Sequence, residues 1–161
     1  MVPATVVPRG LSSAPASRTI LASVLVLGNA IWQRVVAHCL DGLPLEACGL
    51  LAGRPLASQP GDEVIEVYPA RNAAASARLY TVEPRDLLHA DRDAEAAGLS
   101  LVGVWHSHTH TEAYPSPTDV EQAPDPAWHY VLVSLRDSEP VLRSYRIVGA
   151  EVTEEAVVVQ G

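Results

Sequence analysis

The sequence contains no phenylalanine and no lysine, so all eleven of its basic residues are arginines. Aromatic residues make up only 5% of the chain, and the core therefore has to be built from Val, Leu, Ala and Ile. Apolar residues account for 48% and charged residues for 19% of the 161 positions. This composition predicts one soluble globular domain, large enough to bury a core of its own.

Positive charge is scarce, and the formal net charge is −8. Nucleic-acid binding depends on neutralising phosphates, so the charge argues against nucleic acid as a partner. No run of basic residues is present to suggest binding to an anionic membrane. An acidic partner would be repelled except where arginine side chains gather locally.

Cysteines and long apolar runs are also few. The two cysteines, Cys39 and Cys48, form no CxxC pair and no disulfide framework. We expect buried free thiols and a cytoplasmic protein. The longest apolar run, residues 20–27, is too short to span a bilayer. A signal peptide is disfavoured, because cleavage after Ala30 would remove the first predicted core strand.

The order of patterns along the chain predicts an α/β fold. Residues 1–18, rich in Pro, Ala and Ser, are expected to be a disordered tail, and residues 19–161 a single domain. One helix is predicted from an N-cap at Asn29 to about Leu40, and another over residues 84–97. Strands are predicted at 23–27, 47–53, 64–68, 101–108, 130–135, 142–148 and, at a sheet edge, 152–159. The result is a mixed sheet flanked by two main helices.

Several well-known catalytic motifs are missing from the sequence. There is no HExxH, GxSxG, P-loop or GxGxxG motif, and the cysteine pair of zinc deaminases is absent. What the chain does contain is His106-Ser107-His108 at the end of a predicted strand, followed by Ser116-Pro117-Thr118-Asp119.

These two segments have the residue types of a metal site. Side chains alternate along a strand, so His106 and His108 point to the same side. With a carboxylate from Asp119 they form an N,N,O set that leaves a fourth position for water, as in catalytic zinc sites. The alternatives are two ordinary strand histidines and an Asp119 that only caps the helix beginning after Ser116.

Glu46 stands directly before a predicted buried strand, where a neighbouring strand can carry it close to the metal. Spacing alone does not assign it a role. The remaining histidines are weaker candidates for metal ligands. His110 is expected in a loop, although it is able to compete for metal, and His129 is either close to the metal site or part of the core. His38 and His89 are predicted on helices, in structural or exposed positions.

Taken together, Glu46, His106, His108, Ser116 and Asp119 resemble the JAMM motif of the JAB1/MPN metalloproteases at every motif position. The resemblance covers the chain from about residue 24 onward and implies the MPN/JAB fold, which is cytidine-deaminase-like. It also implies that His106, His108 and Asp119 bind Zn²⁺, that Glu46 activates the attacking water, and that Ser116 stabilises the tetrahedral intermediate.

A closer resemblance rests on residues 111–116, 129–134 and 142–148, which are similar to the actinobacterial Mec subfamily. Those enzymes hydrolyse cysteine from the Gly-Gly C-terminus of a small ubiquitin-like sulfur-carrier protein, in cysteine biosynthesis. The resemblance implies such a carrier as partner, with an extended tail that adds along a sheet edge. Tyr114 and Trp105 are candidates to line the groove, although core packing is favoured for Trp105.

Other functions stay open at this point. One alternative is that the enzyme trims the C-terminus of a carrier protein used to incorporate sulfur into a secondary metabolite. Another is that it is a ubiquitin-like isopeptidase. From another class of function, it can be a non-catalytic MPN scaffold, whose signature would be a lost ligand; none is lost here. A homodimer is a further open possibility for the assembly.

Overall fold

The computed structural model describes residues 22–161. The tail predicted for residues 1–18, and the domain boundary that follows it, lie outside these residues. No helix within residues 22–161 has the length and apolar character needed to cross a membrane.

The described residues form one α/β domain, with strands and helices close to the predicted segments. The elements are β1 (Val24–Gly28), α1 (Asn29–Asp41), β2 (Cys48–Pro55), β3 (Gly61–Ala70), α2 (Pro84–Ala96), β4 (Ser100–His108), α3 (Pro117–Glu121), β5 (His129–Ser134), β6 (Val141–Val148) and β7 (Glu151–Gln160). The predicted α/β fold with a mixed sheet and two main helices is confirmed.

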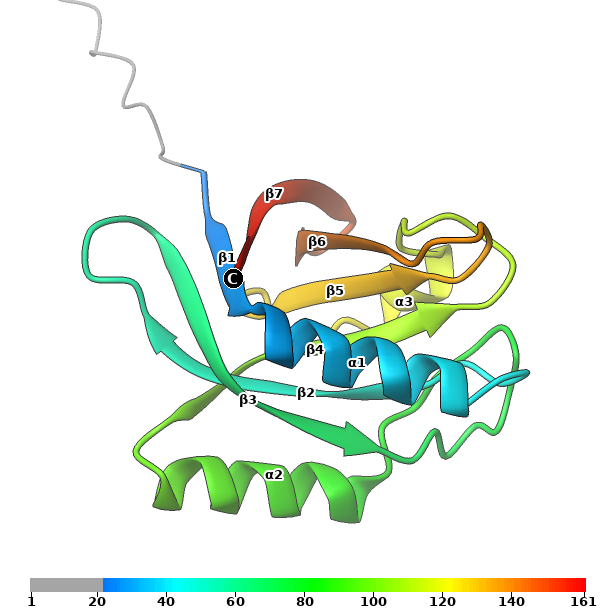
Figure 1. The fold of residues 1–161 in the computed structure, drawn as a ribbon, viewed down its shortest axis with the longest axis horizontal. Coiled ribbons are helices and arrows are strands. Elements are labelled where there is room, and N and C mark those ends of the chain that lie inside the picture. Colours follow the sequence, from blue (N-terminus) through cyan, green and yellow to red (C-terminus); the bar gives the residue numbers. More distant parts are fainter. Residues whose placement is uncertain (1–21) are drawn as a thin grey trace, which may run out of the picture.

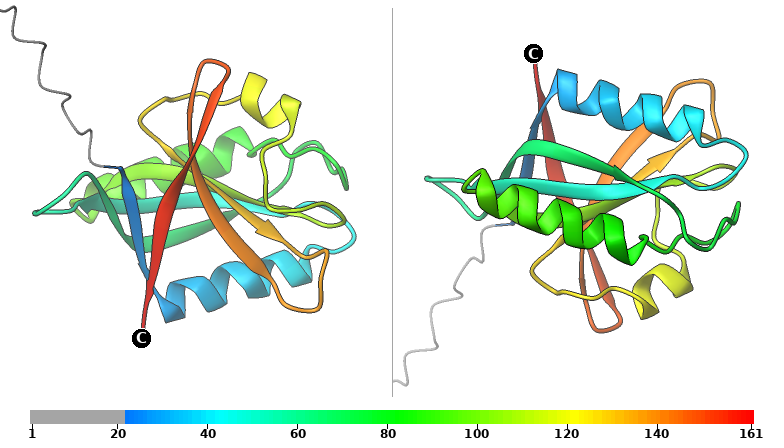
Figure 2. Two further views of the ribbon diagram at one scale, coloured as in Figure 1. Left: turned by 90° about the horizontal axis from the view of Figure 1, so that it is seen from above. Right: turned by 90° about the horizontal axis from the view of Figure 1, so that it is seen from below.

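The sheet closes on itself in the strand order β1-β3-β2-β4-β5-β6-β7, with β7 next to β1 (Figure 1). β1 runs parallel to both of its neighbours: Val24 pairs with Gly61 of β3 and with Ala156 of β7. Figure 2 shows these first and last strands side by side. The strand predicted at residues 152–159 is present as β7, but its expected place at a sheet edge is wrong, because its first half pairs with β6 and its second half with β1.

Successive residues of the central strands feed two separate apolar clusters, one on each face of the sheet. Leu51 and Trp105 pack with Val35 of α1. Their chain neighbours Leu50 and Val104 belong to a second cluster on the face that α2 covers. Figure 2 shows the two helices on different sides of the sheet.

The start of α1 differs from the predicted one. Gly28, with extended backbone, is the N-cap, and no side chain caps the helix. Asn29 is already the first helical residue, because the helix follows β1 without an intervening loop. α2 ends at Ala96, one residue before the predicted end at 97, and Gly98, at φ +70°, stands just beyond the last turn, where a left-handed residue suits glycine.

A buried polar cluster lies inside the barrel, which we call the barrel-end cluster: Asp62, His129, Ser144, Arg146 and Glu155. The His129 ring is fully buried and contacts Glu155 through Nδ1 and Asp62 through Nε2, the latter at 2.9 Å. Ser144 Oγ donates to Glu155 at 2.6 Å, and Arg146 Nε donates to the same carboxylate at 3.1 Å. His129 opens β5, whereas His106 and His108 end the adjacent parallel β4. Of its two predicted places, His129 therefore occupies the core.

This cluster predicts a strong dependence of stability on Glu155. Its carboxylate accepts bonds from His129, Ser144 and Arg146, so Glu155→Ala leaves buried polar groups without their partner. Breaking a buried ion pair from one side costs about 3–5 kcal/mol. We expect that loss in urea denaturation, whereas the control Glu154→Ala, in an exposed pair with Arg143, should change stability by about 1 kcal/mol or less. Equal losses of unfolding free energy in the two variants would mean that the barrel-end cluster stabilises the protein no more than an exposed ion pair does.

The same carboxylate predicts the direction of a pH effect. Burial tends to raise the pKa of Glu155, but bonds from His129 and Ser144 and the charge of Arg146 outweigh it and lower the pKa. A group with a lowered folded-state pKa stabilises the protein above its unfolded pKa, and this contribution is lost as the pH falls through the folded value. We expect Glu155→Gln to show a flatter decline of stability below about pH 4.3 than the wild type.

Candidate metal centre and active-site cleft

β4 delivers two histidines to one face of the sheet. His106 and His108 share the face of Val104, whereas Trp105 and Ser107 point to the opposite side. The buried Ser107 fixes the local backbone, because its Oγ accepts the amide N–H of Ala47 at 2.8 Å and its own N–H donates to the Ala47 carbonyl at 2.9 Å. These two bonds hold the segment before β2 against the end of β4, where Cys48 pairs with His106.

α3 brings the carboxylate. Ser116 is the N-cap: its Oγ accepts the Asp119 N–H at 3.2 Å, and the Asp119 Oδ2 accepts the Ser116 N–H at 2.7 Å. This reciprocal pair is a capping box, with Pro117 at the first helical position. The predicted cap is therefore present. It also fixes the Asp119 rotamer toward the histidines, so that capping and ligation are compatible.

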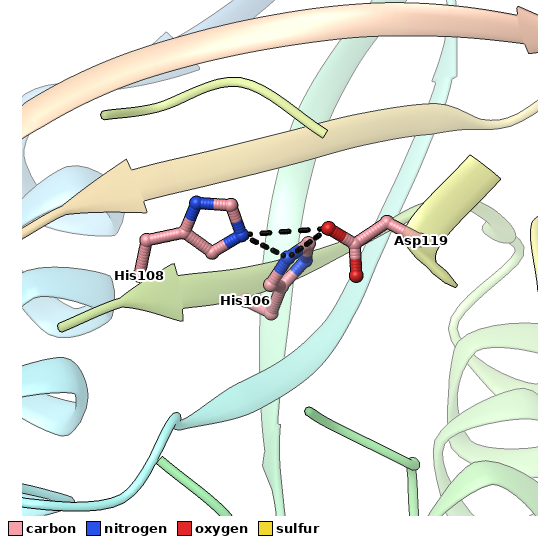
Figure 3. A group of neighbouring side chains, drawn as sticks. All are labelled: His106, His108 and Asp119. Carbon is pink, nitrogen blue, oxygen red and sulfur yellow. Dashed lines mark hydrogen bonds and ion pairs between the residues drawn. The ribbon is translucent and has the colours of Figure 1, made fainter. Parts of the chain in front are cut away.

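The three side chains converge on one point (Figure 3). Nε2 of His106 lies 3.2 Å from Nε2 of His108, and each nitrogen lies 3.4 Å from Oδ2 of Asp119. All three residues are buried, with at most 8% of their surface exposed. The structure thus brings together the three residues that the sequence suggested as metal ligands, as a group that can hold a metal ion.

Protonation states at this group suit a cation. His108 Nδ1 donates to the Glu112 carbonyl at 2.8 Å, which leaves Nε2 with its lone pair. Burial lowers the pKa of His106 and favours its neutral form. Burial alone would raise the pKa of Asp119, but hydrogen bonds from both histidines outweigh it and lower that pKa. The pKa of His108 is raised, because burial is outweighed by its bonds to Asp119 and the Glu112 carbonyl and by the charge of Glu46, so a bound cation would have to displace a proton there. Two imidazoles and one carboxylate are a donor set that fits zinc and similar divalent metals.

Tyr80 completes the surroundings of His106, and sequence reasoning missed it. Its ring stacks on the His106 imidazole with centroids 4.1 Å apart and planes 18° from parallel. Tyr80 also lines an apolar pocket of about 220 Å³ together with Leu50, Val104 and Trp128. The stack holds the His106 ring in one orientation. No local pattern around Tyr80 signals this contact, because it depends on the path of a loop.

Glu46 borders the same site. It precedes β2, is 5% exposed, and lines a cleft of about 580 Å³ with His108, Ser116 and residues 77–78 and 109–111, here called the active-site cleft. Burial raises the pKa of Glu46 to about 7; the charge of His108 opposes this rise and that of Asp119 adds to it. A carboxyl group with such a pKa is able to take up and release a proton at neutral pH.

A loop between β3 and α2 is tied to Glu46 by Asn72, a residue that the sequence did not single out. The Asn72 amide donates to the carbonyls of Glu46 and Leu79, both at 2.9 Å, while its oxygen accepts from the N–H groups of Ala74 and Thr81, both at 3.0 Å. Asn before an Ala-rich run is a common turn signal. Its bond to Glu46 is a tertiary contact with no local signature.

The other predicted residues occupy less central positions. His110 is an exposed loop residue, as predicted, and its Nδ1 lies 2.7 Å from the Thr109 hydroxyl. Trp105 is fully buried and therefore belongs to the core, as favoured. Tyr114 is 52% exposed and stacks edge-on against Tyr145. Every strand over residues 22–161 has two neighbours in the barrel, but β1 pairs with β3 only over residues 61–64, so residues 66–70 of β3 pair with β2 alone and leave a short sheet edge.

The two remaining histidines stand on helices as predicted. His38 of α1 is half-buried and contacts the Trp105 ring edge-on, with centroids 5.4 Å apart. His89 of α2 is exposed. Neither belongs to the metal-binding group.

Known proteins resemble the chain in sequence and in structure. The family described as prokaryotic homologues of the JAB domain matches residues 28–148. A CysO-cysteine peptidase of Mycobacterium tuberculosis is 44% identical over 135 residues, 83% of this chain and 90% of that protein. A desampylase of Haloferax volcanii is 32% identical, over 62% of this chain and 73% of its own length. The solution structure of a Desulfitobacterium hafniense protein aligns with a TM-score of 0.77 and 34% identity, over 84% of this chain and 92% of that one.

These matches confirm the resemblance drawn from the motif. The matched family region contains both histidines, Asp119 and Glu46, and the structure assembles His106, His108 and Asp119 as a buried group. The chain therefore belongs to the prokaryotic homologues of the JAB domain and is a metallopeptidase of the JAMM type.

Proposed function

We propose that the protein hydrolyses the amide bond between a ubiquitin-like sulfur-carrier protein, ending in Gly-Gly, and a C-terminal cysteine. The observation that carries this proposal is the buried group of His106, His108 and Asp119 at a cleft shared by Glu46 and Ser116. The similarity to CysO-cysteine peptidases over most of both chains supports the choice of substrate.

Zinc is the proposed metal, held by Nε2 of His106, Nε2 of His108 and Oδ2 of Asp119. When bound, zinc polarises the scissile carbonyl and acidifies a water molecule. The chain's own contribution comes from Glu46, which accepts a proton from the attacking water and returns it to the departing amine. Its pKa, raised by burial to about 7, suits both transfers.

Ser116 is proposed to stabilise the tetrahedral intermediate. Its Oγ accepts the Asp119 N–H, an acceptor role that leaves the hydroxyl hydrogen available. Among the described residues no acceptor takes that hydrogen, and Ser116 lines the active-site cleft. The hydroxyl can therefore donate to the oxyanion that develops on the scissile carbonyl.

The reaction is expected to take place in the cytoplasm. Cys39 and Cys48 are both free and buried, and burial raises the pKa of each thiol to about 12. Such inert thiols are typical of proteins in a reducing compartment.

The decisive experiment uses a carrier protein ending in Gly-Gly-Cys. Intact-mass spectrometry should show the loss of one cysteine residue in the presence of the zinc-loaded protein, and no loss after chelation. A carrier that already ends in Gly-Gly should remain unchanged, which excludes further trimming. An unaltered Gly-Gly-Cys carrier would overturn the proposal, and release of a carrier joined to a lysine side chain would favour an isopeptidase instead.

A further inference from the structure

One arginine of the active-site cleft has no ionic partner. Most arginines of residues 22–161 lie within 4.0 Å of a carboxylate. Arg78, Arg85 and Arg92 have no such pair within this part of the chain, and of these only Arg78 lines the cleft that Glu46 and Ser116 share. The protein has a net charge of −8, so carboxylates are plentiful. The exposed Arg78 guanidinium is nevertheless unpaired within the described residues and is available to bind an anionic ligand in the cleft.

The backbone that carries Arg78 is fixed on both sides of the cleft. The Ser76 carbonyl accepts the N–H of Glu46 at 2.9 Å, and the Ser76 hydroxyl accepts the N–H of Arg78 at 3.1 Å. The next carbonyl, that of Ala77, accepts a hydrogen bond at 3.3 Å from the hydroxyl of Thr109, the residue directly after β4. The backbone of Arg78 is therefore held at a set position relative to the proposed general base, so this loop need not be ordered when a ligand binds.

The proposed substrate carries an anion close to its scissile bond. In a carrier–cysteine adduct the free α-carboxylate follows that bond by one residue, within about 4 Å of the carbonyl carbon that is attacked. The nearby Glu46 carboxylate repels this group when ionised, and a guanidinium in the same cleft offsets that repulsion. A guanidinium binds a carboxylate through two parallel N–H donors, a geometry that a lysine does not reproduce.

We infer that Arg78 binds the free α-carboxylate of the residue that is released, and so makes the enzyme a carboxypeptidase that removes one terminal residue. This inference rests on the proposed function and deepens it. It also separates substrates by chemistry, because an isopeptide bond to a lysine side chain presents no carboxylate at that position.

The test compares two carriers that differ only at the last group: one ends in Gly-Gly-Cys with a free acid, the other in Gly-Gly-Cys amide. For the wild type we expect a KM about 10- to 100-fold higher with the amide, the range that follows from losing one charge-assisted pair. Arg78→Gln should raise KM for the acid by the same factor, leave the amide unaffected and change kcat little. Arg78→Lys should recover part of the loss.

Arg85→Gln provides the matched control, because Arg85 also lacks an ion pair in the described chain but lies on α2, outside the cleft. It should leave both substrates unaffected. Equal KM values for acid and amide in the wild type, or equal losses on both in Arg78→Gln, would overturn the inference. If the wild type hydrolyses neither carrier, the proposed function is wrong. Calorimetric binding of the two carriers to the metal-loaded protein then decides: tighter binding of the acid that requires Arg78 supports the site, and equal binding refutes it.

Discussion

Glu46→Gln should lower kcat for carrier hydrolysis by about 10²–10⁴-fold, the usual contribution of a general acid–base group. The substitution keeps the size and hydrogen-bonding capacity of the side chain but removes its ability to take up a proton. Glu46 is not one of the three converging ligands, so metal content should remain at one ion per chain. Single-turnover kinetics together with elemental analysis measure the two quantities on the same sample.

Glu112→Gln is a suitable control for this variant. Glu112 lies in the loop after β4 and its side chain is exposed, while its backbone carbonyl, which accepts from His108, is unchanged by the substitution. We expect activity close to that of the wild type. Near-normal turnover of Glu46→Gln would show that another group moves the proton, and a loss of metal in that variant would assign Glu46 a ligand role.

Asp119→Ala is expected to abolish metal binding at stoichiometric concentration and, with it, hydrolysis. Substituting a residue that hydrogen-bonds to a metal ligand already weakens metal affinity by about 10- to 100-fold. Removing a ligand itself should therefore lower metal affinity by at least about 100-fold. Asp119 Oδ2 lies 3.4 Å from both imidazole nitrogens, and no other carboxylate of the described residues joins this group. Competition with a chromogenic chelator measures the affinity directly.

Asp119→Asn separates the two roles of this residue. The amide oxygen can still accept the Ser116 N–H, so the capping box survives in part, whereas the charged ligand is gone. We expect both variants to lose metal but only Asp119→Ala to lose about 0.5–2 kcal/mol of additional stability in the metal-free protein. If either variant retains a full complement of metal, Asp119 is a helix cap and nothing more.

The local parts of this site could be predicted from the sequence because local rules produce them. Alternation along a strand places His106 and His108 on one face, and the Ser116 and Asp119 pattern forms the expected capping box. Glu46 is different. Its approach to the site depends on β2 pairing with β4, where Cys48 faces His106, and no spacing in the sequence encodes that register. Family resemblance supplied what local physics did not.

What the sequence did not predict depends on contacts between distant segments. The closure of the sheet requires β1 to pair with β7, and the sequence of residues 152–159 predicts a strand without naming its neighbours. Asn72 and Tyr80 act through a loop whose path is set by the surrounding barrel. The N-cap of α1 was misplaced by one residue, which is within the usual uncertainty of a helix boundary.

Closure of the barrel through its first and last strands has a consequence for the order of folding. Val24 pairs with Ala156, so this contact closes a loop that contains nearly the whole domain and forms late on entropic grounds. The proposed metal ligands belong to β4 and α3, which leave the ribosome well before β7. We therefore expect His106, His108 and Asp119 to come together while the sheet is still open. β7 then pairs with β1 last and closes the barrel. Removing β7 should leave the sheet open while keeping all three proposed ligands in the chain.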